Sequence, residues 1–574
     1  MRLCFFDLIA LPVLAATLAA ASAQSPAAAS AAPAAAGTGA AAPDAEATLH
    51  FIHSSWDVLK RSMGDCRSLV DVKVRSLPVL YLPAGFAMPA EVAAAQRECH
   101  ARVLTLPKSI EKIGDLQPQE LPAEGLLYLP KAYIVPGGRF NEMYGWDSYF
   151  ILLGLEAEHR EKLARGIVEN FLFEIEHYGG VLNANRTYYL TRSQPPFLTS
   201  MIRLVIEDPR SFADTVEGRL ARRAWFEHAY ELAAKDYSTW TRPEHRAGMT
   251  RLARYWDYGS GPAPEMADAS TYYPDVIRAL VEHGGQEAAG FLVKGSEHPE
   301  AAEAARLKAT SCDVNASVVC MRAWFGGYRL SRAFYQGDRA MRESGFDSSD
   351  RFGAFSGASE DYAPVDLNCL LYRYERDMEH FAHLLGDGRD AQMWDRRAMA
   401  RNAAIHRYLW RAKEGVFADW DFTHARASNY AYITSLYPLW SGVASREEAR
   451  SMEAKLSLFE RAGGLSTSTH ESGLQWDEPY GWAPTNWIAV AGLEATGYRS
   501  DAARIAAHWN ATVDRGFAQD GTMREKYNVV SGDAKVTVTA GYTQNAIGFG
   551  WTNAVYLKMG QIVAEQEARE AANR

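Results

Sequence analysis

Apolar residues recur at helical spacing through most of this 574-residue chain, and this periodicity limits its fold more than any other feature. In residues 163–175 the apolar side chains share one helical face, and Gly179-Gly180 ends the helix. Residues 365–385 repeat the pattern and end at Gly386. The same spacing predicts helices in 301–309, 390–412, 446–461, 485–497, 501–515 and near the C-terminus. Strand-like alternation is scarce and is clearest in "KVTVT", residues 535–539.

Long loops rich in glycine, proline and aromatic residues separate these predicted helices. No strict sequence period is present, which argues against a regular solenoid. The composition, 48% hydrophobic and 23% charged, supplies enough apolar material for a large core. We therefore predict an all-α toroid that carries its function on the loops.

The N-terminus reads "MRLCFFDLIALPVLAATLAAASAQ". One arginine, an apolar run and then Ala-Ser-Ala predict a signal peptide over residues 1–23. Residues 24–48, rich in alanine and proline, are expected to form a flexible leader before a functional domain over 49–574. No other segment is long and apolar enough to span a bilayer. This pattern predicts an exported protein, periplasmic or secreted, that has no membrane contact after cleavage.

Five cysteines follow the predicted cleavage point, so at least one of them is unpaired. Cys312 with Cys320 and Cys66 with Cys99 are candidate disulfides, and the pairing is left open, with Cys369 the fifth thiol. No Cys/His cluster has the spacing of a metal site, so neither a metal nor another cofactor is expected. The net charge of -10 and the lack of a basic block argue against nucleic acid as a partner.

Five polar loops of similar character lie between the predicted helices. They are "PGGRFNEMYGWDSYF" at 136–150, "NANRTYYLTRSQPPF" at 183–197, "ESGFDSSDRF" at 343–352, "QWDEPYGWAP" at 475–484, and "REKYNVV" at 524–530 followed by "GYTQNAIGFGWTN". Each alone is explained by a surface turn with an ion pair. Because all five mix charged groups with rings that stack on sugars, we interpret them together as the rim of a carbohydrate cleft.

These motifs resemble those of the trehalase family, glycoside hydrolase family 37. "PGGRFNEMYGWDSY" and "QWDEPYGWAP" match its two signatures, and "RSQPPF", "PVDLN" and "GFGWTN" also recur there. The resemblance spans roughly residues 49–560. It implies an (α/α)6 barrel with long functional loops and the inverting hydrolysis of α,α-trehalose to two glucose molecules. It also implies an exported bacterial-type α,α-trehalase, a monomer that binds a disaccharide and needs no cofactor.

The resemblance also implies residue roles. Asp347 in "SGFD" corresponds to the general acid and Glu525 in "EKY" to the general base. Inverting glycosidases need such a pair about 6.5–9.5 Å apart, with room for a water between them. Nine residues fall on positions that contact the sugar: Arg139, Trp146, Asp147, Asn183, Arg192, Ser193, Gln194, Glu265 and Gly345. Glu142 is as well explained by a scaffold role as by substrate contact.

Several positions depart from the family pattern. Ala263 stands where the family has an arginine, before Pro264 and Glu265. Extra residues precede Asp347, and "SGDAKVTVTAGYTQ" replaces a glycine-rich lid, with Gly541 where a glutamate is expected; Phe346 replaces a tryptophan. Three arginines in or near the extra segment are candidates for a replacement cation: Arg322, Arg329 and Arg332. The missing lid and Gly541 favour the other outcome, in which nothing replaces the cation and a roomier, less polar cleft prefers a substituted or different glucoside. Two alternatives stay open, another α-glucoside or modified trehalose as substrate, and a catalytically impaired sugar-binding protein.

Overall fold

Six helices of the computed structural model pack in a closed ring. The structure describes residues 45–70, 77–266, 271–285, 287–539 and 545–574. Around the ring α4 packs on α6, α6 on α12, α12 on α14, α14 on α16, α16 on α18, and α18 again on α4. These six helices are α4 (Gly145–Ala157), α6 (Leu198–Glu207), α12 (Val365–Leu385), α14 (Tyr437–Ser441), α16 (Ala483–Thr496) and α18 (Gly550–Ala572).

A second set of six helices packs outside the ring. It consists of α5 (Glu161–Tyr178), α7 (Val216–Trp240), α13 (Gly388–Tyr408), α15 (Arg446–Glu453), α17 (Arg499–Asp520) and α1 (Ala45–Leu59). From α4 onward the chain alternates between the two sets, so the described residues form the predicted (α/α)6 barrel. The all-α prediction is confirmed.

The sequence explains which helices are inside. Helix α4 is buried on every side from Gly145 to Leu155, whereas α5 buries one face and ends at Gly179 with φ of 87°, a left-handed cap that favours glycine. Where the ring closes, a Cβ added at Gly154 of α4 would lie 2.7 Å from the Cβ of Ala554 in α18. Small residues therefore let the first and last helices of the ring approach closely.

The strands are short and lie in the connections. The pairs are β1 (Lys60–Arg61) with β5 (Tyr133–Ile134), β6 (Leu292–Lys294) with β7 (Tyr328–Leu330), β9 (Trp410–Arg411) with β10 (Val416–Phe417), β13 (Glu460–Arg461) with β14 (Gly464–Leu465), and β15 (Tyr480–Trp482) with β16 (Lys526–Asn528). Three-stranded sheets join β3 (Arg102–Thr105), β2 (Val79–Leu82) and β4 (Leu126–Leu127), and β12 (Arg426–Ala427), β11 (Trp420–Asp421) and β8 (Tyr362–Ala363). In the antiparallel ribbon β15–β16, Trp482 pairs with Lys526.

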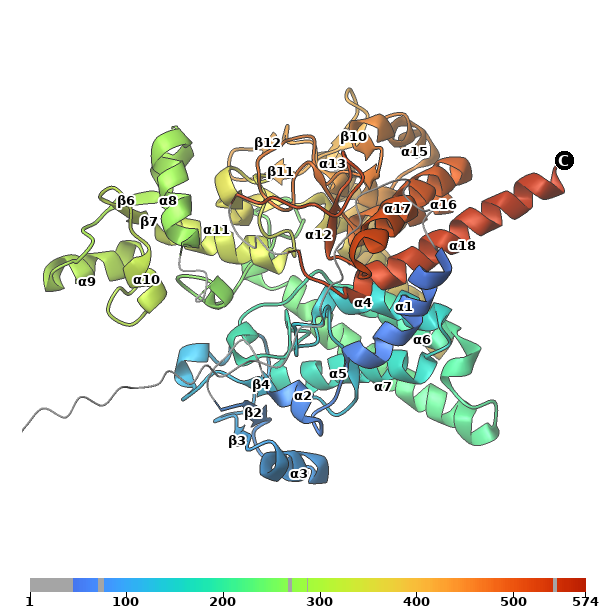
Figure 1. Ribbon diagram of the computed structural model, residues 1–574, viewed down its shortest axis with the longest axis horizontal. Helices are drawn as coiled ribbons and strands as arrows, with labels where there is room; N and C mark the ends of the chain where they lie inside the picture. The colour runs from blue at the N-terminus through green and yellow to red at the C-terminus, as the bar shows by residue number, and fades with distance from the viewer. Residues whose placement is uncertain (1–44, 71–76, 267–270, 286, 540–544) are drawn as a thin grey trace, which may run out of the picture. The chain divides into compact units, whose positions relative to one another are not determined.

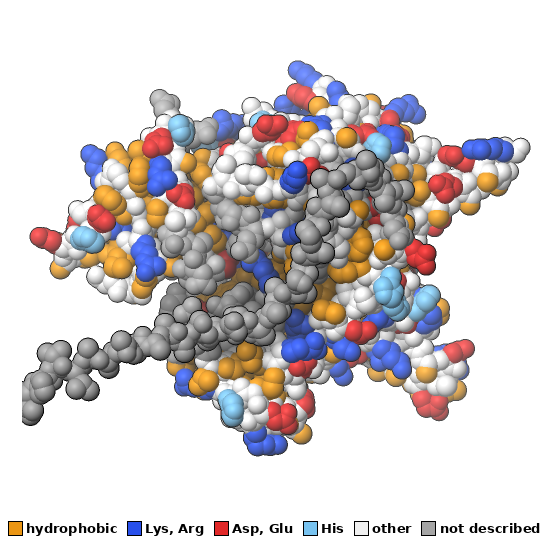
Figure 2. All heavy atoms as spheres, in the orientation of Figure 1, with side chains coloured by type: hydrophobic (Ala, Val, Ile, Leu, Met, Phe, Trp, Pro, Cys, Tyr) orange, Lys and Arg blue, Asp and Glu red, His pale blue; other side chains and the backbone are white. Residues whose placement is uncertain are grey.

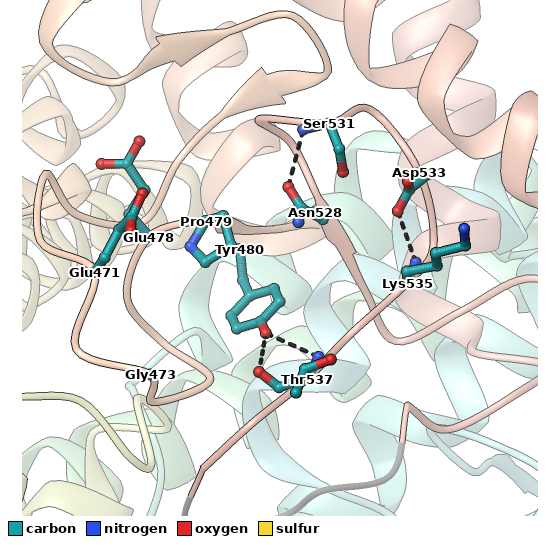
Figure 3. A pocket seen from close by; sticks show the side chains of 10 residues that line it. All are labelled: Glu471, Gly473, Glu478, Pro479, Tyr480, Asn528, Ser531, Asp533, Lys535 and Thr537. Atoms are coloured by element: carbon teal, nitrogen blue, oxygen red, sulfur yellow. Dashed lines mark hydrogen bonds between the residues drawn. The ribbon is translucent and has the colours of Figure 1, made fainter.

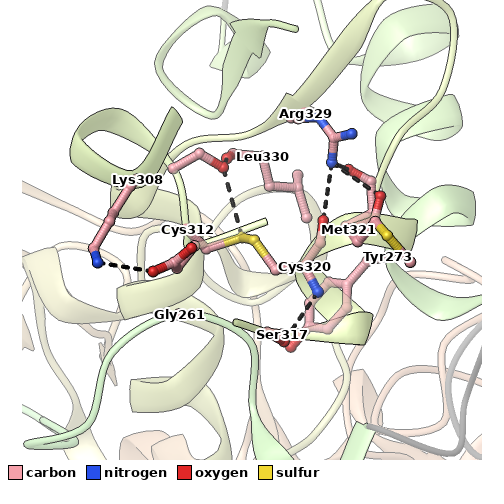
Figure 4. The surroundings of a disulfide bond; sticks show 12 residues. Gly261, Tyr273, Lys308, Cys312, Ser317, Cys320, Met321, Arg329 and Leu330 are labelled. Carbon is pink, nitrogen blue, oxygen red and sulfur yellow. Dashed lines mark hydrogen bonds and ion pairs between the residues drawn. A yellow bond between two sulfur atoms is a disulfide. The ribbon is translucent and has the colours of Figure 1, made fainter. Parts of the chain in front are cut away.

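The extra segment before Asp347 builds a module with its own apolar core. It contains α8 (Tyr272–His283), α9 (Ala301–Thr310), α10 (Val318–Arg322), β6 and β7, which lie together in Figure 1, and it continues into α11 (Arg332–Glu343). The disulfide Cys312–Cys320 lies in this core, and the Arg329 guanidinium donates to the backbone carbonyls of Cys320 and Met321 (Figure 4). The module leads directly to the predicted acid.

Both candidate disulfides form. In addition to Cys312–Cys320, Cys66, which begins α2 (Cys66–Leu69), pairs with Cys99, which directly follows α3 (Ala90–Glu98). Among the described residues Cys369 is the free cysteine, and it is buried. The strand predicted at 535–539 is wrong: these residues form no strand. Their backbone is bonded instead to a neighbouring loop, since Thr537 N–H donates to the Tyr480 hydroxyl at 3.0 Å and Thr539 N–H to Gly473 O at 3.0 Å.

Other boundaries differ modestly. The helix predicted for 446–461 ends at Glu453 and is followed by the turn into β13. Helix α1 begins at Ala45, ahead of the expected domain start at residue 49. The predicted signal peptide, nearly all of the leader, and Gly541 lie outside the described residues. In the part of the chain that the structure describes, no helix combines the length and apolarity needed to cross a membrane.

Candidate active site

The predicted site residues lie on the segments that enter the inner helices. The segment before α4 carries Arg139, that before α6 Asn183, that before α12 Asp347, and that before α18 Glu525. The segment before α16 carries the motif residue Gln475, which was not predicted as a site residue. Because an outer helix returns the chain after most inner ones, these segments reach the same end of the barrel. The fold therefore brings together residues far apart in sequence.

Two carboxyl groups at this end, Asp147 and Asp347, have raised pKa values. Burial, together with the nearby charges of Glu525 and Asp347, raises the pKa of Asp147 to about 8. Burial and the charge of Glu265 raise the pKa of Asp347 to about 7, against the opposing effect of Arg342. The Asp347 side chain nevertheless keeps 24% of its surface exposed, as contact with a substrate requires. The structure thus places a protonatable carboxyl group near two further carboxylates.

A cation that the sequence did not indicate lies beside Asp347. Arg342, in the last turn of α11, approaches Asp347 Oδ2 with Nη1 at 3.5 Å and Asp338 with Nη2 at 3.2 Å. Asp338 also accepts hydrogen bonds from the hydroxyls of Tyr272 and Tyr273. A signal was available, because Arg342 precedes Asp347 by five residues and follows Asp338 by one helical turn.

The three predicted replacement cations lie elsewhere. Arg329 is buried among backbone carbonyls of the module, and Arg332 donates to Lys308 O at 3.1 Å. Arg322 is exposed at the end of α10. Ala263 is fully buried in the module core, where its N–H donates to the Tyr273 hydroxyl at 2.8 Å. None of these three candidates is the cation beside Asp347, which is Arg342.

Arg192 connects several predicted sugar-binding residues. Its Nε donates to Asn183 Oδ1 at 2.9 Å, one terminal nitrogen lies 3.6 Å from Asp257 Oδ2, and the other donates to Glu265 Oε1. Burial alone would raise the pKa of Glu265, but the guanidinium groups of Arg192 and Arg342 outweigh this effect and lower the pKa. Glu265 Oε2 is buried and has no hydrogen-bond partner among the described residues, so it is an available acceptor for a sugar hydroxyl.

Two of the predicted sugar-binding residues hold the backbone of the site. The Ser193 hydroxyl donates to Val181 O at 2.6 Å, and Gln194 Oε1 accepts from the Trp146 backbone N–H at 3.0 Å, which fixes the start of α4. Arg139 is exposed, and its guanidinium lies 4.6 Å from the ring centroid of Phe140. Contact of these residues with a sugar stays a prediction.

Trp146 is the centre of an aromatic cluster. Its ring centroid lies 5.5 Å from that of Phe346, 5.9 Å from Trp476 and 6.0 Å from Trp551. Gly345 has φ of +77°, and an added Cβ would lie 2.8 Å from Cε2 of Trp146, so only glycine fits there. Trp476 and Trp551 were not predicted as site residues, although both lie within the quoted motifs.

Of the two roles considered for Glu142, scaffold and substrate contact, the contacts of its side chain favour the scaffold role. Its carboxylate is fully buried, and Arg186 lies 2.6 Å from Glu142 Oε1. Within the described residues no cluster of His, Cys, Asp and Glu has a metal-binding arrangement.

A cavity of about 440 Å³ lies beside the β15–β16 ribbon (Figure 3). Its ten lining residues, which come from the segments 471–480 and 528–537, include neither Asp347 nor Glu525. Because side chains alternate along a strand, Tyr480 in its lining shares a face of the ribbon with Trp482, and Asn528 with Lys526. Three hydrogen bonds join residues of this lining: Tyr480 to Thr537, Ser531 to Asn528, and Lys535 to Asp533.

A protonatable carboxyl, a second carboxylate, arginines and a cluster of tryptophans on an (α/α)6 barrel define a site of the glycoside hydrolase class. The family model described as trehalase matches residues 43–280 and 329–563. The chain belongs to the trehalase family. The unmatched residues 281–328 fall within the inserted module.

Curated relatives support this family. A cytosolic neutral trehalase of Beauveria bassiana is 33% identical over 506 residues, which cover 81% of this chain and 63% of the relative. A cytosolic neutral trehalase of Saccharomyces cerevisiae is 34% identical over 76% of this chain and 58% of its own length. The solved structure of neutral trehalase Nth1 from S. cerevisiae has a TM-score of 0.72 and 30% identity, covering 91% of this chain and 94% of that one. The chain thus spans about three fifths of the length of these curated relatives.

These comparisons contradict one expectation. The N-terminal pattern predicted an exported protein, periplasmic or secreted, of the bacterial type. The similar proteins are fungal enzymes named cytosolic neutral trehalases, so the prediction of export is wrong.

Proposed function

We propose that this protein is an inverting glycoside hydrolase that cleaves α,α-trehalose to two glucose molecules without a cofactor. The observation that carries the proposal is the carboxyl pair at one end of the barrel. Asp347 has a pKa raised to about 7, and Glu525 Oε2 lies 3.2 Å from the Lys526 ammonium group. One group is suited to donating a proton and the other to being held as a carboxylate.

In this proposal Asp347 protonates the glycosidic oxygen while Glu525 removes a proton from an attacking water. Asp147, Asn183, Arg192 and Glu265 bind sugar hydroxyls, and the open acceptor on Glu265 supports its part. Trp146, backed by Gly345, forms an apolar wall against a sugar face. Arg139, Ser193 and Gln194 are proposed to complete the binding positions.

Arg342 supports trehalose as the substrate despite Ala263. A guanidinium beside the reacting centre supplies charge-assisted hydrogen bonds, each worth about 1.5–3 kcal/mol. The family arginine is missing at Ala263, but Arg342 places a guanidinium 3.5 Å from the acid from another direction. An impaired binding protein is correspondingly less well supported than an enzyme.

Activity on trehalose is expected to fall as the pH rises through about 7. Asp347 carries its proton below its pKa of about 7 and loses it above, and a general acid works only when protonated. The raised pKa values of Asp347 and Asp147 mean that the folded state holds these protons more tightly than the unfolded chain, so their contribution to stability declines as the pH rises from about 4 to 7–8 and levels off above. We expect kcat/KM to drop by about tenfold per pH unit above the transition. Initial rates from pH 5 to 9, with melting temperatures at each pH, measure both effects; a flat rate up to pH 9 contradicts the role of Asp347.

Hydrolysis of trehalose is expected to yield equal amounts of α- and β-glucose at early times. Inversion changes the configuration of the attacked anomeric carbon, while the leaving glucose keeps its α configuration. Proton NMR of the anomeric signals, recorded before mutarotation, tests this prediction. Only α-glucose at early times excludes single-step inversion, and no glucose at all excludes trehalose as the substrate.

A second substrate class, another α-glucoside or a modified trehalose, is favoured by one observation. The inserted module replaces an arginine with the small buried Ala263 close to Glu265. Glucose release over a panel of α-linked disaccharides separates the two: the highest kcat/KM on trehalose supports the first proposal, and the highest on another glucoside supports the second.

The proposed partner is a small disaccharide, bound by a monomer. Acidic and basic side chains are interspersed on the face shown in Figure 2, and the net charge is -10. Such a distribution suits neither a phosphate backbone nor an anionic membrane surface. Light scattering of the purified protein checks the monomer.

A further inference from the structure

Two buried side chains connect the acid segment with the base segment. The Gln475 side-chain amide donates through Nε2 to the backbone carbonyl of Asp347 and accepts through Oε1 from Lys526 Nζ at 2.9 Å. Lys526 Nζ in turn lies 3.2 Å from Glu525 Oε2. One amide and one ammonium group therefore span the distance between the acid's backbone and the base's carboxylate.

Both side chains are held firmly in place. Lys526 is fully buried and Gln475 is 4% exposed. The indole N–H of Trp482 donates to the backbone carbonyl of Gln475 at 2.9 Å, and Lys526 Nζ lies 4.9 Å from the Trp482 ring centroid. Trp482 and Lys526 are paired in the β15–β16 ribbon, so Trp482 supports both Gln475 and Lys526.

The chemistry of the two groups suits this place. A primary amide carries a donor and an acceptor on one rigid plane, so Gln475 bonds a carbonyl on one side and an ammonium on the other. A buried ammonium without a carboxylate partner is costly, which ties Lys526 to Glu525. An inverting mechanism depends on the separation and orientation of acid and base, because a water must fit between them.

We propose that Gln475 and Lys526 are positioning residues that set the geometry of Asp347 relative to Glu525. Gln475 fixes the segment that carries Asp347, and Lys526 orients the carboxylate of Glu525. The hydrogen bond between the two side chains couples these two effects. The inference rests on the proposed hydrolase function. It assigns the pair no contact with substrate.

The test compares Gln475→Met, Lys526→Met and the double variant on trehalose. Methionine keeps the length of either side chain and removes its polar end. Each single variant is expected to lower kcat by about 10–100-fold with KM within threefold, since a misplacement of about 1 Å costs about that much. The double variant is expected to lie within about threefold of the worse single variant, because the two residues act as one unit.

The pH profile separates positioning from a general structural role. Loss of the Lys526 charge is expected to move the acid-side limb of the kcat/KM profile upward by about one pH unit, whereas Gln475→Met leaves that limb in place. Lys535→Met is the matched control, because Lys535 is exposed beyond β16, and its kinetics are expected to equal those of the wild type.

Different outcomes overturn different claims. Two results overturn this inference alone, provided that the wild type is active on trehalose. One is a double variant whose loss in kcat equals the product of the two single losses. The other is a Lys526→Met variant whose acid-side limb does not move. A wild type inactive on every glucoside overturns the proposed function and the inference with it. If Lys526→Met does not fold, Gln475→Met decides: kcat within twofold of wild type rejects the proposal, and a tenfold loss at constant KM and unchanged melting temperature supports it.

Discussion

Asp347→Asn is expected to lower kcat on trehalose by about 10²–10⁴-fold, the usual contribution of a positioned general acid. The amide has nearly the shape of the carboxyl group but cannot give a proton to the leaving oxygen. Folding is expected to survive, because Asp347 keeps 24% of its side-chain surface exposed. Initial rates with trehalose, together with a circular dichroism spectrum and a melting curve, measure the effect.

A substrate whose leaving group needs no proton isolates this role. With α-glucosyl fluoride, Asp347→Asn is expected to keep most of the wild-type rate, since fluoride departs unprotonated. Asp350→Asn is the matched control on the same segment: its carboxylate accepts the Phe355 N–H at 2.7 Å, which an asparagine oxygen also accepts. Near-wild-type turnover of trehalose by Asp347→Asn, or equal losses on both substrates, contradicts the assignment of the acid.

Glu525→Gln is expected to reduce kcat by about 10²–10⁴-fold on trehalose and on α-glucosyl fluoride alike. Both reactions need an activated water, whatever the leaving group. The amide has no carboxylate to accept the proton, and it also breaks the ion pair with the buried Lys526. The comparison is made with both substrates at saturating concentration.

Glu471→Gln provides the control for this second change, since Glu471 is exposed on the neighbouring loop and lines the adjoining cavity. Its turnover is expected to match the wild type. If Glu525→Gln lost trehalose activity but kept the fluoride reaction, Glu525 would be acting on the leaving group and the two roles would be exchanged.

The helical architecture was predictable because helical periodicity is a local property. Apolar spacing located α5 and α12, and Gly179 and Gly386 marked their ends. The closure of the ring was different. It depends on contacts such as that between Gly154 and Ala554, 400 positions apart, and it entered the prediction through family resemblance.

The site was predictable where a residue belongs to a motif and less so where geometry decides. Asp147, Asp347 and Glu525 come together as the motifs imply. Arg342 was missed although it precedes Asp347 by only five residues, because this spacing alone does not show that the inserted module turns α11 toward the acid. The strand at 535–539 failed because Tyr480, far away in sequence, bonds the backbone of Thr537.

The closed ring also has a consequence for the timing of synthesis. Helix α4 is complete once residue 157 has been made, but its partner α18 begins only at Gly550. At ~5–20 residues per second, roughly 20–80 s of translation separate the two helices. During that interval the face of α4 that includes Gly154 has no α18 to cover it, and Glu525 joins the acid near the end. A nascent chain of this protein therefore exposes apolar surface to chaperones for most of its synthesis, and it brings its proposed acid and base together among the last steps of folding.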